Sequence, residues 1–124
     1  MSAVGVDVGD LNACVCQIRK GTVATVLNEA SKRTTVMVAS LQGTERYMGD
    51  AAATKAVSNY KNSAVEMKRL LGLSFKEAQE EISKMPNGAK YVEDPKTGGI
   101  LIPIVYEDFE KPEMFSPTQV MGML

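Results

Sequence analysis

The stretch from Ala3 to Ile18 constrains the fold of this chain more than any other, because apolar residues alternate there with small or polar ones. This period of two is that of a β-strand, whose side chains point alternately to opposite faces. One face carries three valines and the other a carboxylate between two glycines: Val4, Val6 and Val8 against Gly5, Asp7 and Gly9. The valine face is expected to be core. Glycines in a strand indicate a bulge or the close approach of a ligand or another backbone.

Residues 9–12 form the next feature, a turn that leads into strands over residues 13–18 and 22–27. We expect an antiparallel three-stranded meander whose first turn lies beside a buried Asp7. Amides that converge in such a turn can receive a phosphate, while the carboxylate holds the water shell of a magnesium ion. The alternative is ordinary turn chemistry, in which Asp and Gly supply a local hydrogen bond and a positive φ.

The length and the charge balance exclude several classes of protein. A chain of 124 residues can form one domain with a core. With 14 basic and 15 acidic residues its net charge is −1, so binding to nucleic acid or to a membrane surface has no electrostatic support. No apolar run reaches the length of a membrane span and no secretory signal is visible, which predicts a cytoplasmic protein. Cys14 and Cys16 lack the further ligands of a zinc site and are interpreted as small apolar residues.

The sequence of the middle of the chain predicts alternating strands and helices. We expect strands over residues 34–40 and 46–48 around a turn at 42–44, then a helix over 51–57 that Gly49 and Asp50 open. A second helix is expected over residues 63–71, ending at Gly72, with an apolar arc of Ala64, Met67 and Leu71. Lys68 falls inside that arc, while Arg69 lies further round and is expected to be exposed. A lysine in an apolar stripe either extends its stem to the rim or reaches something that needs a positive charge.

Two capping motifs mark helix starts in the last third of the chain. Ser74 and Glu77 have the spacing of a capping box, before a helix whose apolar side carries Phe75, Ala78, Ile82 and Met85. A hairpin is expected from residues 89–93 and 100–106, with Pro103 at an edge or a bulge, and an acidic loop over 107–113 follows. Ser116 and Pro117 begin a final helix. It has no polar stop before Leu124, so we expect the natural sequence to continue.

Seven of these segments, in this order and spacing, resemble the start of the ATPase domain of the seventy-kilodalton heat-shock protein family. They are Val4-Gly-Val-Asp-Val-Gly9, Ala13-Cys-Val15, Asn28-Glu-Ala-Ser-Lys-Arg-Thr-Thr35, Tyr47-Met-Gly-Asp-Ala-Ala52, Ser58-Asn-Tyr-Lys-Asn62, Lys68-Arg-Leu-Leu-Gly72 and Phe115-Ser-Pro117. Asn28-Glu-Ala-Ser31 and Gly72-Leu73 are most similar to the hundred-and-ten-kilodalton and ribosome-associated branches.

The resemblance implies an α/β architecture, the ribonuclease H-like or actin-like ATPase fold, of which this chain is the first half of lobe I. Residues 1–30 and 114–124 would belong to the inner subdomain and residues 31–113 to the outer one. ATP or ADP with magnesium would lie between this lobe and a second lobe. The first phosphate loop would consist of Asp7, Gly9 and the backbone of Asp10, Leu11 and Asn12, with Asp7 holding magnesium through water. Lys68 would be the catalytic lysine that orients the attacking water and neutralises the transferred phosphoryl group.

Four residues depart from the pattern of active members, and one of them, Val36 in place of a proline, affects only chain stiffness. Asp10 and Leu11 stand where those have two threonines, and Ala13 replaces a serine. A second carboxylate beside three phosphates opposes binding, so we expect weak or absent hydrolysis. The resemblance implies a chaperone or co-chaperone that acts with another seventy-kilodalton chaperone or with an unfolded or nascent polypeptide. The isolated chain is expected to be inert, because half of the nucleotide cleft is missing, and to self-associate through uncovered apolar surface.

Two other functions compete with this interpretation. A magnesium nuclease of the ribonuclease H type starts with a similar meander, but it needs further carboxylates and a basic surface that the sequence does not show. A non-enzymatic interaction module would dock a partner through Tyr91, Tyr106 and the acidic loop.

Overall fold

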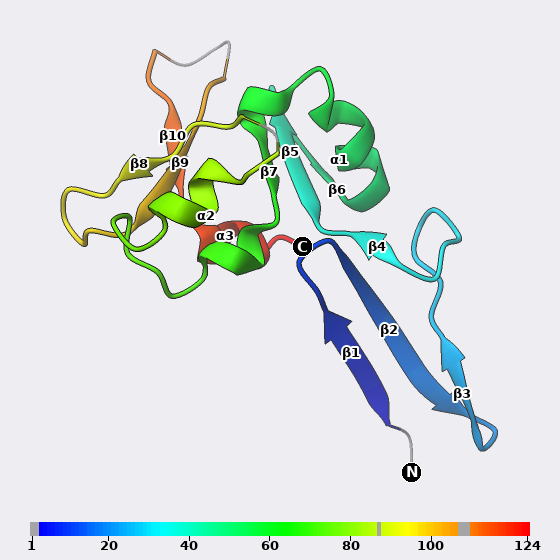
Figure 1. Cartoon of the computed structure of the whole chain (residues 1–124). Helices are drawn as coiled ribbons and strands as arrows, with labels where there is room; N and C mark the ends of the chain where they lie inside the picture. Colours follow the sequence, from blue (N-terminus) through cyan, green and yellow to red (C-terminus); the bar gives the residue numbers. More distant parts are fainter. Residues whose placement is uncertain (1–2, 87, 107–109) are drawn as a thin grey trace.

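The computed structural model describes residues 3–86, 88–106 and 110–124. Its strands form three small sheets, and the first is the predicted meander (Figure 1). β1 (Val4–Val8) pairs antiparallel with β2 (Asn12–Arg19), and β2 pairs antiparallel with β3 (Thr22–Thr25). The short β4 (Thr35–Val36) pairs with the start of β2. The three-stranded antiparallel meander is therefore confirmed, with a third strand two residues shorter than predicted.

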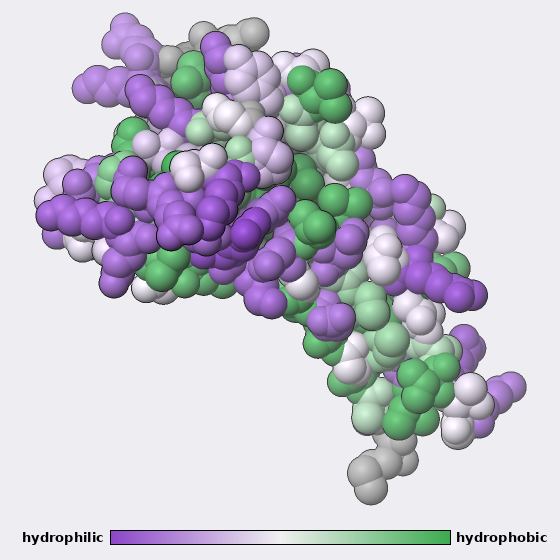
Figure 2. All heavy atoms as spheres, viewed as in Figure 1, coloured by the Kyte–Doolittle hydropathy of each residue, from purple (hydrophilic) through white to green (hydrophobic). Residues whose placement is uncertain are grey.

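The valine face of β1 is not core, and this prediction is wrong. Val4, Val6 and Val8 have 65%, 63% and 38% of their surface exposed, and Asp7 is exposed on the opposite face. The reason lies in the packing: the meander extends away from the rest of the chain, and no described element covers either face of β1 (Figure 1). Figure 2 shows apolar side chains, coloured green, at the surface of this projecting part.

The second sheet has β5 (Val38–Gln42) between β6 (Glu45–Met48) and β7 (Ser63–Val65). Helix α1 (Gly49–Ala56) packs against β5 and β6, and the 3₁₀ turn η1 (Tyr60–Asn62) follows it. The single strand predicted over residues 34–40 is divided at Met37, so that β4 belongs to the first sheet and β5 to the second. Residues 35–42 thus tie the meander to the folded body.

The helix predicted over residues 63–71 is wrong. Residues 63–65 form β7, which pairs with β5 in the register Ala39↔Ala64. Glu66 then adopts a left-handed backbone with φ of 53°, and a 3₁₀ turn, η2 (Met67–Leu70), completes the segment. Met67 and Leu70 are buried, whereas Leu71, which the helical arc placed inside, is 38% exposed. Pairing with β5 outweighed the helical periodicity of these residues.

The third sheet has β9 (Ile100–Ile104) between β8 (Val92–Glu93) and β10 (Glu113–Phe115). The predicted hairpin is confirmed, but β10 was not predicted. The edge position of Pro103 is wrong, because β9 is the central strand. Pro103 is accommodated since β8 pairs only with Ile100 and Leu101, which leaves the β8 side of Pro103 outside the ladder. The predicted acidic loop lies partly outside the described residues.

The reciprocal hydrogen bonds of both predicted capping motifs are confirmed, but a helix starting at Ser74 is wrong, because α2 begins at Gln79 with Ala78 as its N-cap. The amide of Ser74 donates to the carboxylate of Glu77 at 2.9 Å, and the amide of Glu77 donates to the Ser74 hydroxyl at 3.4 Å. A turn follows before the short α2 (Gln79–Ser83). The final helix α3 (Pro117–Met121) begins with a full capping box between Ser116 and Gln119.

One buried cluster joins the second and third sheets with η2, α2 and α3. Its members are Ala39, Leu41, Ala64, Met67, Leu70, Ala78, Met85, Tyr91, Ile100, Ile102, Ile104, Phe115 and Val120. Helix α3 packs in this cluster against η2 and β9. The division into an inner and an outer subdomain stays a prediction.

Candidate functional site

The candidate site is built around the turn between β1 and β2. The Gly9 amide donates to the Asn12 carbonyl at 2.9 Å, which closes the turn directly before the first β1–β2 pair, Val8 and Ala13. A Cβ atom at Gly9 would stand 2.7 Å from that carbonyl oxygen, closer than real Cβ contacts come. Glycine is therefore required here by the close approach of backbone to backbone.

Lys68 reaches this turn from the other part of the chain. Its Nζ atom donates to the carbonyl oxygen of Val8 at 2.7 Å across 60 positions of sequence. The backbone of η2 holds the lysine there, because Met67 and Leu70 on either side of it anchor that turn in the core. Two interpretations were open for Lys68: a stem that extends to the rim, or a charge that reaches a group in need of it. The structure shows an exposed side chain whose ammonium group is directed at the Val8 carbonyl.

The other predicted site residues divide into two groups. Asp7 and Gly9 are the chain neighbours of Val8, whose carbonyl oxygen accepts the hydrogen bond from Lys68. Asp10, Leu11 and Asn12 instead line a neighbouring pocket of about 220 Å³. Neither Asp7 nor Lys68 lines that pocket. The structure thus brings Lys68 to the end of β1, and it directs the loop residues towards a separate hollow.

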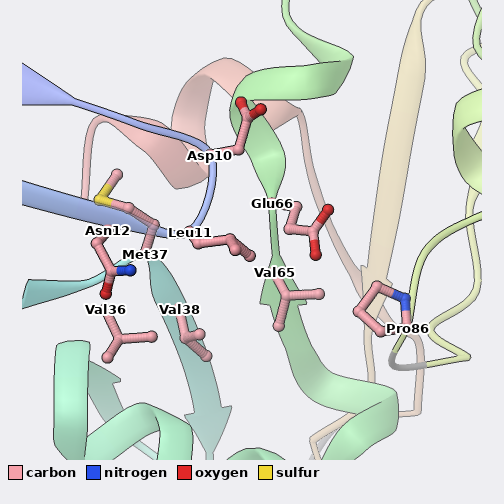
Figure 3. Close-up of a pocket in the computed structure, with 9 residues that line it drawn as sticks. All are labelled: Asp10, Leu11, Asn12, Val36, Met37, Val38, Val65, Glu66 and Pro86. Atoms are coloured by element: carbon pink, nitrogen blue, oxygen red, sulfur yellow. The ribbon is translucent and has the colours of Figure 1, made fainter.

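The pocket lies where the meander meets the second sheet (Figure 3). The Met37 amide donates to the Leu11 carbonyl at 2.8 Å, which fixes the loop against the β4–β5 junction. Most of the lining is apolar, and Glu66 adds a carboxylate: Leu11, Val36, Met37, Val38, Val65 and Pro86 surround it together with Asp10, Asn12 and Glu66. The sequence analysis did not predict Glu66 or Pro86 as pocket residues. Glu66 was missed because a helix was predicted over residues 63–71, where the structure has a turn that brings Glu66 to the pocket.

Arg69 organises the negative charges beside the pocket, and its predicted exposure is wrong. Its guanidinium pairs with Glu66 at 2.6 Å and with Glu81 at 3.0 Å, and the residue is half-buried. The hydrogen bond to Glu66 raises the pKa of Arg69, and the charges of Glu81 and Asp10 raise it further. Asp10 thus lies within electrostatic range of Arg69. The i,i+3 spacing of Glu66 and Arg69 is the sequence signal that could have indicated this pair.

The residues at the turn fit a hydrated magnesium ion better than a directly bound one. Among the described residues no three His, Cys, Asp or Glu side chains gather closely enough to hold a metal. Magnesium keeps several of its waters and needs only one or two carboxylates, so the exposed carboxylate of Asp7 suits it. A nuclease of the ribonuclease H type would need a cluster of carboxylates, and the described residues show no such cluster.

Tyr91 does not fit the hypothesis of a non-enzymatic interaction module. Tyr91 is buried in the core cluster with 9% of its surface exposed, so it cannot dock a partner. Burial raises the pKa of its hydroxyl to about 12, with the charge of Glu66 as a second cause.

Within the described part of the chain, no helix is long and apolar enough to cross a membrane.

Comparison with known proteins gives one consistent result. Residues 3–124 match the family model described as Hsp70 protein. The whole chain aligns with Heat shock 70 kDa protein 14 of Arabidopsis thaliana at 35% identity and with Heat shock 70 kDa protein 4L of Homo sapiens at 35% identity. It also aligns over its whole length with a 97 kDa heat shock protein of Strongylocentrotus purpuratus at 32% identity. The chain spans 15%, 14% and 14% of these three relatives.

Proposed function

Because this chain belongs to the Hsp70 protein family, we propose that it supplies the first phosphate loop and the catalytic lysine of an ATP-binding chaperone of the heat-shock type. Family membership implies the actin-like ATPase fold, with which the mixed α/β structure is consistent. The observation that carries the proposal is the hydrogen bond from Lys68 to Val8, since it joins the two predicted halves of the site across the fold.

Each residue of the turn has a role in this proposal. Asp7 would hold the water shell of magnesium, and the backbone of Asp10, Leu11 and Asn12 would receive the phosphates. Lys68 leaves the Val8 carbonyl and places its ammonium group against the transferred phosphoryl group, where it offsets negative charge. The bound nucleotide supplies the phosphoanhydride bond whose hydrolysis would drive the cycle. An exposed lysine with a single backbone acceptor can make this exchange at little cost.

Asp10 decides whether ATP is hydrolysed or only bound. At an effective dielectric near 20, two unit charges about 4 Å apart repel by about 4 kcal/mol. Asp10 and Leu11 line the neighbouring pocket, where Asp10 lies within electrostatic range of Arg69. We therefore propose nucleotide binding with slow or absent turnover in the full-length protein. Action on another seventy-kilodalton chaperone or on an unfolded polypeptide, and a cytoplasmic location, remain predictions.

Calorimetric titration of magnesium ATP into the full-length protein tests the proposal. We expect binding by the unmodified protein and at least tenfold weaker binding or slower turnover after Lys68→Met. Lys61→Met is the matched control, because Lys61 is an exposed lysine over the ring of Tyr60, away from the turn. Binding that appears only after Asp10→Thr would establish a degenerate site that keeps the fold for its partners. No binding by either protein would overturn the proposal.

A further inference from the structure

Two thiols lie side by side on β2 and have no part in the proposed nucleotide site. Cys14 and Cys16 are two positions apart, so both side chains are on one face of the strand. Their Sγ atoms are 4.0 Å apart, and both residues are free and half-buried. The sequence analysis treated them as small apolar residues, which does not account for two sulfur atoms held in contact.

The surroundings leave these thiols accessible. Cys16 lies between Gly5 on β1 and Thr25 on β3, and its Sγ atom is 3.9 Å from the Thr25 hydroxyl. A Cβ atom added at Gly5 would meet no described atom within 4 Å, so the face that Gly5 shares with Cys16 is open beside Gly5. Cys14 pairs in register with Asp7 across β1. A ligand above the two sulfur atoms would therefore find open space on the face that also carries Asp7.

A disulfide between the two residues does not fit this strand. The Cα atoms of residues two positions apart in a β-strand are about 6.6–6.8 Å apart, which is the upper limit for a disulfide. Their Cα–Cβ bonds are parallel, so the two Cβ atoms are about equally far apart. The sulfur atoms are 4.0 Å apart, about twice the length of an S–S bond. Closing that distance would bend β2, which β1 and β3 hold from both edges. The pair therefore stays open as a dithiol.

A metal ion can bridge two sulfur atoms at this distance. With the zinc–sulfur bond length of about 2.3 Å, two ligands 4.0 Å apart subtend an angle of about 120° at the ion, which is the angle of a trigonal site with a third ligand from solution. Thiolates select soft ions, and Cu(I) accepts two or three ligands, whereas a structural zinc site needs four. We infer that Cys14 and Cys16 form a chelating site for one Cu(I) ion. Binding replaces two S–H bonds with two Cu–S bonds and releases two protons, with no change of oxidation state.

Competition with a coloured chelator tests this site on the chain itself and without nucleotide, so its failure is separate from failure of the proposed function. The reduced chain is titrated under anaerobic conditions with Cu(I) held by bicinchoninate, and loss of colour reports transfer. We expect one equivalent of Cu(I) per chain, and at least a hundredfold weaker affinity after Cys14→Ser or Cys16→Ser. Retention of the original affinity by the Cys14→Ser, Cys16→Ser double variant would overturn the site.

A second variant separates geometry from the number of thiols. Cys14→Ser combined with Ala24→Cys keeps two thiols, but Ala24 neighbours Thr25 on β3 and therefore points to the face opposite Cys16. We expect this variant to bind as weakly as the single serine variants, and an affinity equal to that of the unmodified chain would overturn the proposal. Alkylation gives a readout that needs no variant: Cu(I) should protect Cys14 and Cys16 together from iodoacetamide, and labelling of either at the unprotected rate contradicts chelation.

Discussion

The Nζ atom of Lys68 and the carbonyl oxygen of Val8 lie 2.7 Å apart, although 60 positions separate the two residues. This hydrogen bond connects η2 in the folded body with the end of β1 in the projecting meander (Figure 1). Because the lysine is exposed and its acceptor is a single backbone oxygen, the bond positions the side chain more than it stabilises the fold.

We predict that Lys68→Met lowers the free energy of unfolding of this chain by only about 1 kcal/mol, since one exposed charge-assisted hydrogen bond is lost. Urea denaturation followed by circular dichroism measures the change. Lys61→Met, at an exposed lysine without a bond to the turn, should change the stability by less than about 0.5 kcal/mol. A loss above about 3 kcal/mol after Lys68→Met would show a structural role instead.

The turn at Gly9 should not tolerate a side chain. Gly9→Ala places a methyl group 2.7 Å from the Asn12 carbonyl, which is backbone and cannot move aside cheaply. We expect the Gly9–Asn12 hydrogen bond to break and the chain to lose about 1–3 kcal/mol of stability. Gly5→Ala in β1 is the control, since its methyl group meets no atom and should stabilise the strand by about 0.5–1 kcal/mol. Equal effects of the two substitutions would contradict the structure.

A pair of buried hydroxyls should contribute to the second sheet. Ser63 Oγ donates to Ser40 Oγ at 2.8 Å, the Asn59 side-chain amide donates to the same Ser40 oxygen at 3.1 Å, and both serines are fully buried. Ser40→Ala removes the buried hydroxyl that both groups contact, while Ser63 Oγ keeps the Asn59 carbonyl at 2.7 Å and the Asn59 amide keeps the Leu41 carbonyl at 2.8 Å as acceptors. The loss of this hydroxyl should cost about 1 kcal/mol in chemical denaturation. Ser58→Ala removes an exposed hydroxyl that bonds only the Lys55 carbonyl among the contacts described, and it should be nearly neutral. A neutral Ser40→Ala would contradict the buried pair.

Tyr91 should make the stability of the fold sensitive to alkaline pH. Its hydroxyl has no hydrogen-bond partner among the described residues, and burial raises its pKa from 10.0 to about 12. The unfolded chain ionises first, so the stability that this group contributes is present below pH 10 and is lost as the pH rises towards 12. A shift of this size limits that loss to about 3 kcal/mol.

Melting temperatures between pH 8 and 12 test this prediction. Tyr91→Phe should flatten the alkaline decline, and at neutral pH it should keep or raise the stability by about 1 kcal/mol, because it removes an unsatisfied buried polar group. Tyr60→Phe, at an exposed ring, is the matched control. An unchanged decline after Tyr91→Phe would show that the hydroxyl is solvated.

The exposed meander should make the isolated chain self-associate. Val4, Val6 and Val23 are each more than 60% exposed, and β1 is an edge strand of its sheet. Uncovered apolar strands with a free edge pair readily with another copy. Sedimentation velocity should therefore show dimers or larger species as the concentration rises, and Val6→Lys should suppress them. A monomer at every concentration would refute this expectation.

Local interactions made much of the structure predictable. The capping boxes at Ser74 and Ser116 each close within three residues, so the sequence pattern contains every group that they need. The hairpin of β1 and β2 likewise needs only a turn and two strands of period two. The resemblance to a family supplied the site residues, and the structure then placed Lys68 beside the turn without testing its chemistry.

The sequence by itself determined the short-range elements, namely the caps, the turns and the meander, because their hydrogen bonds join neighbours in the chain. Only the tertiary structure decided the elements whose partners are distant. Residues 63–65 have a helical periodicity but become β7, because β5 offers an open edge 25 positions earlier in the chain. The valines of β1 form a core pattern but stay exposed, since burial depends on a layer that a strand cannot specify alone.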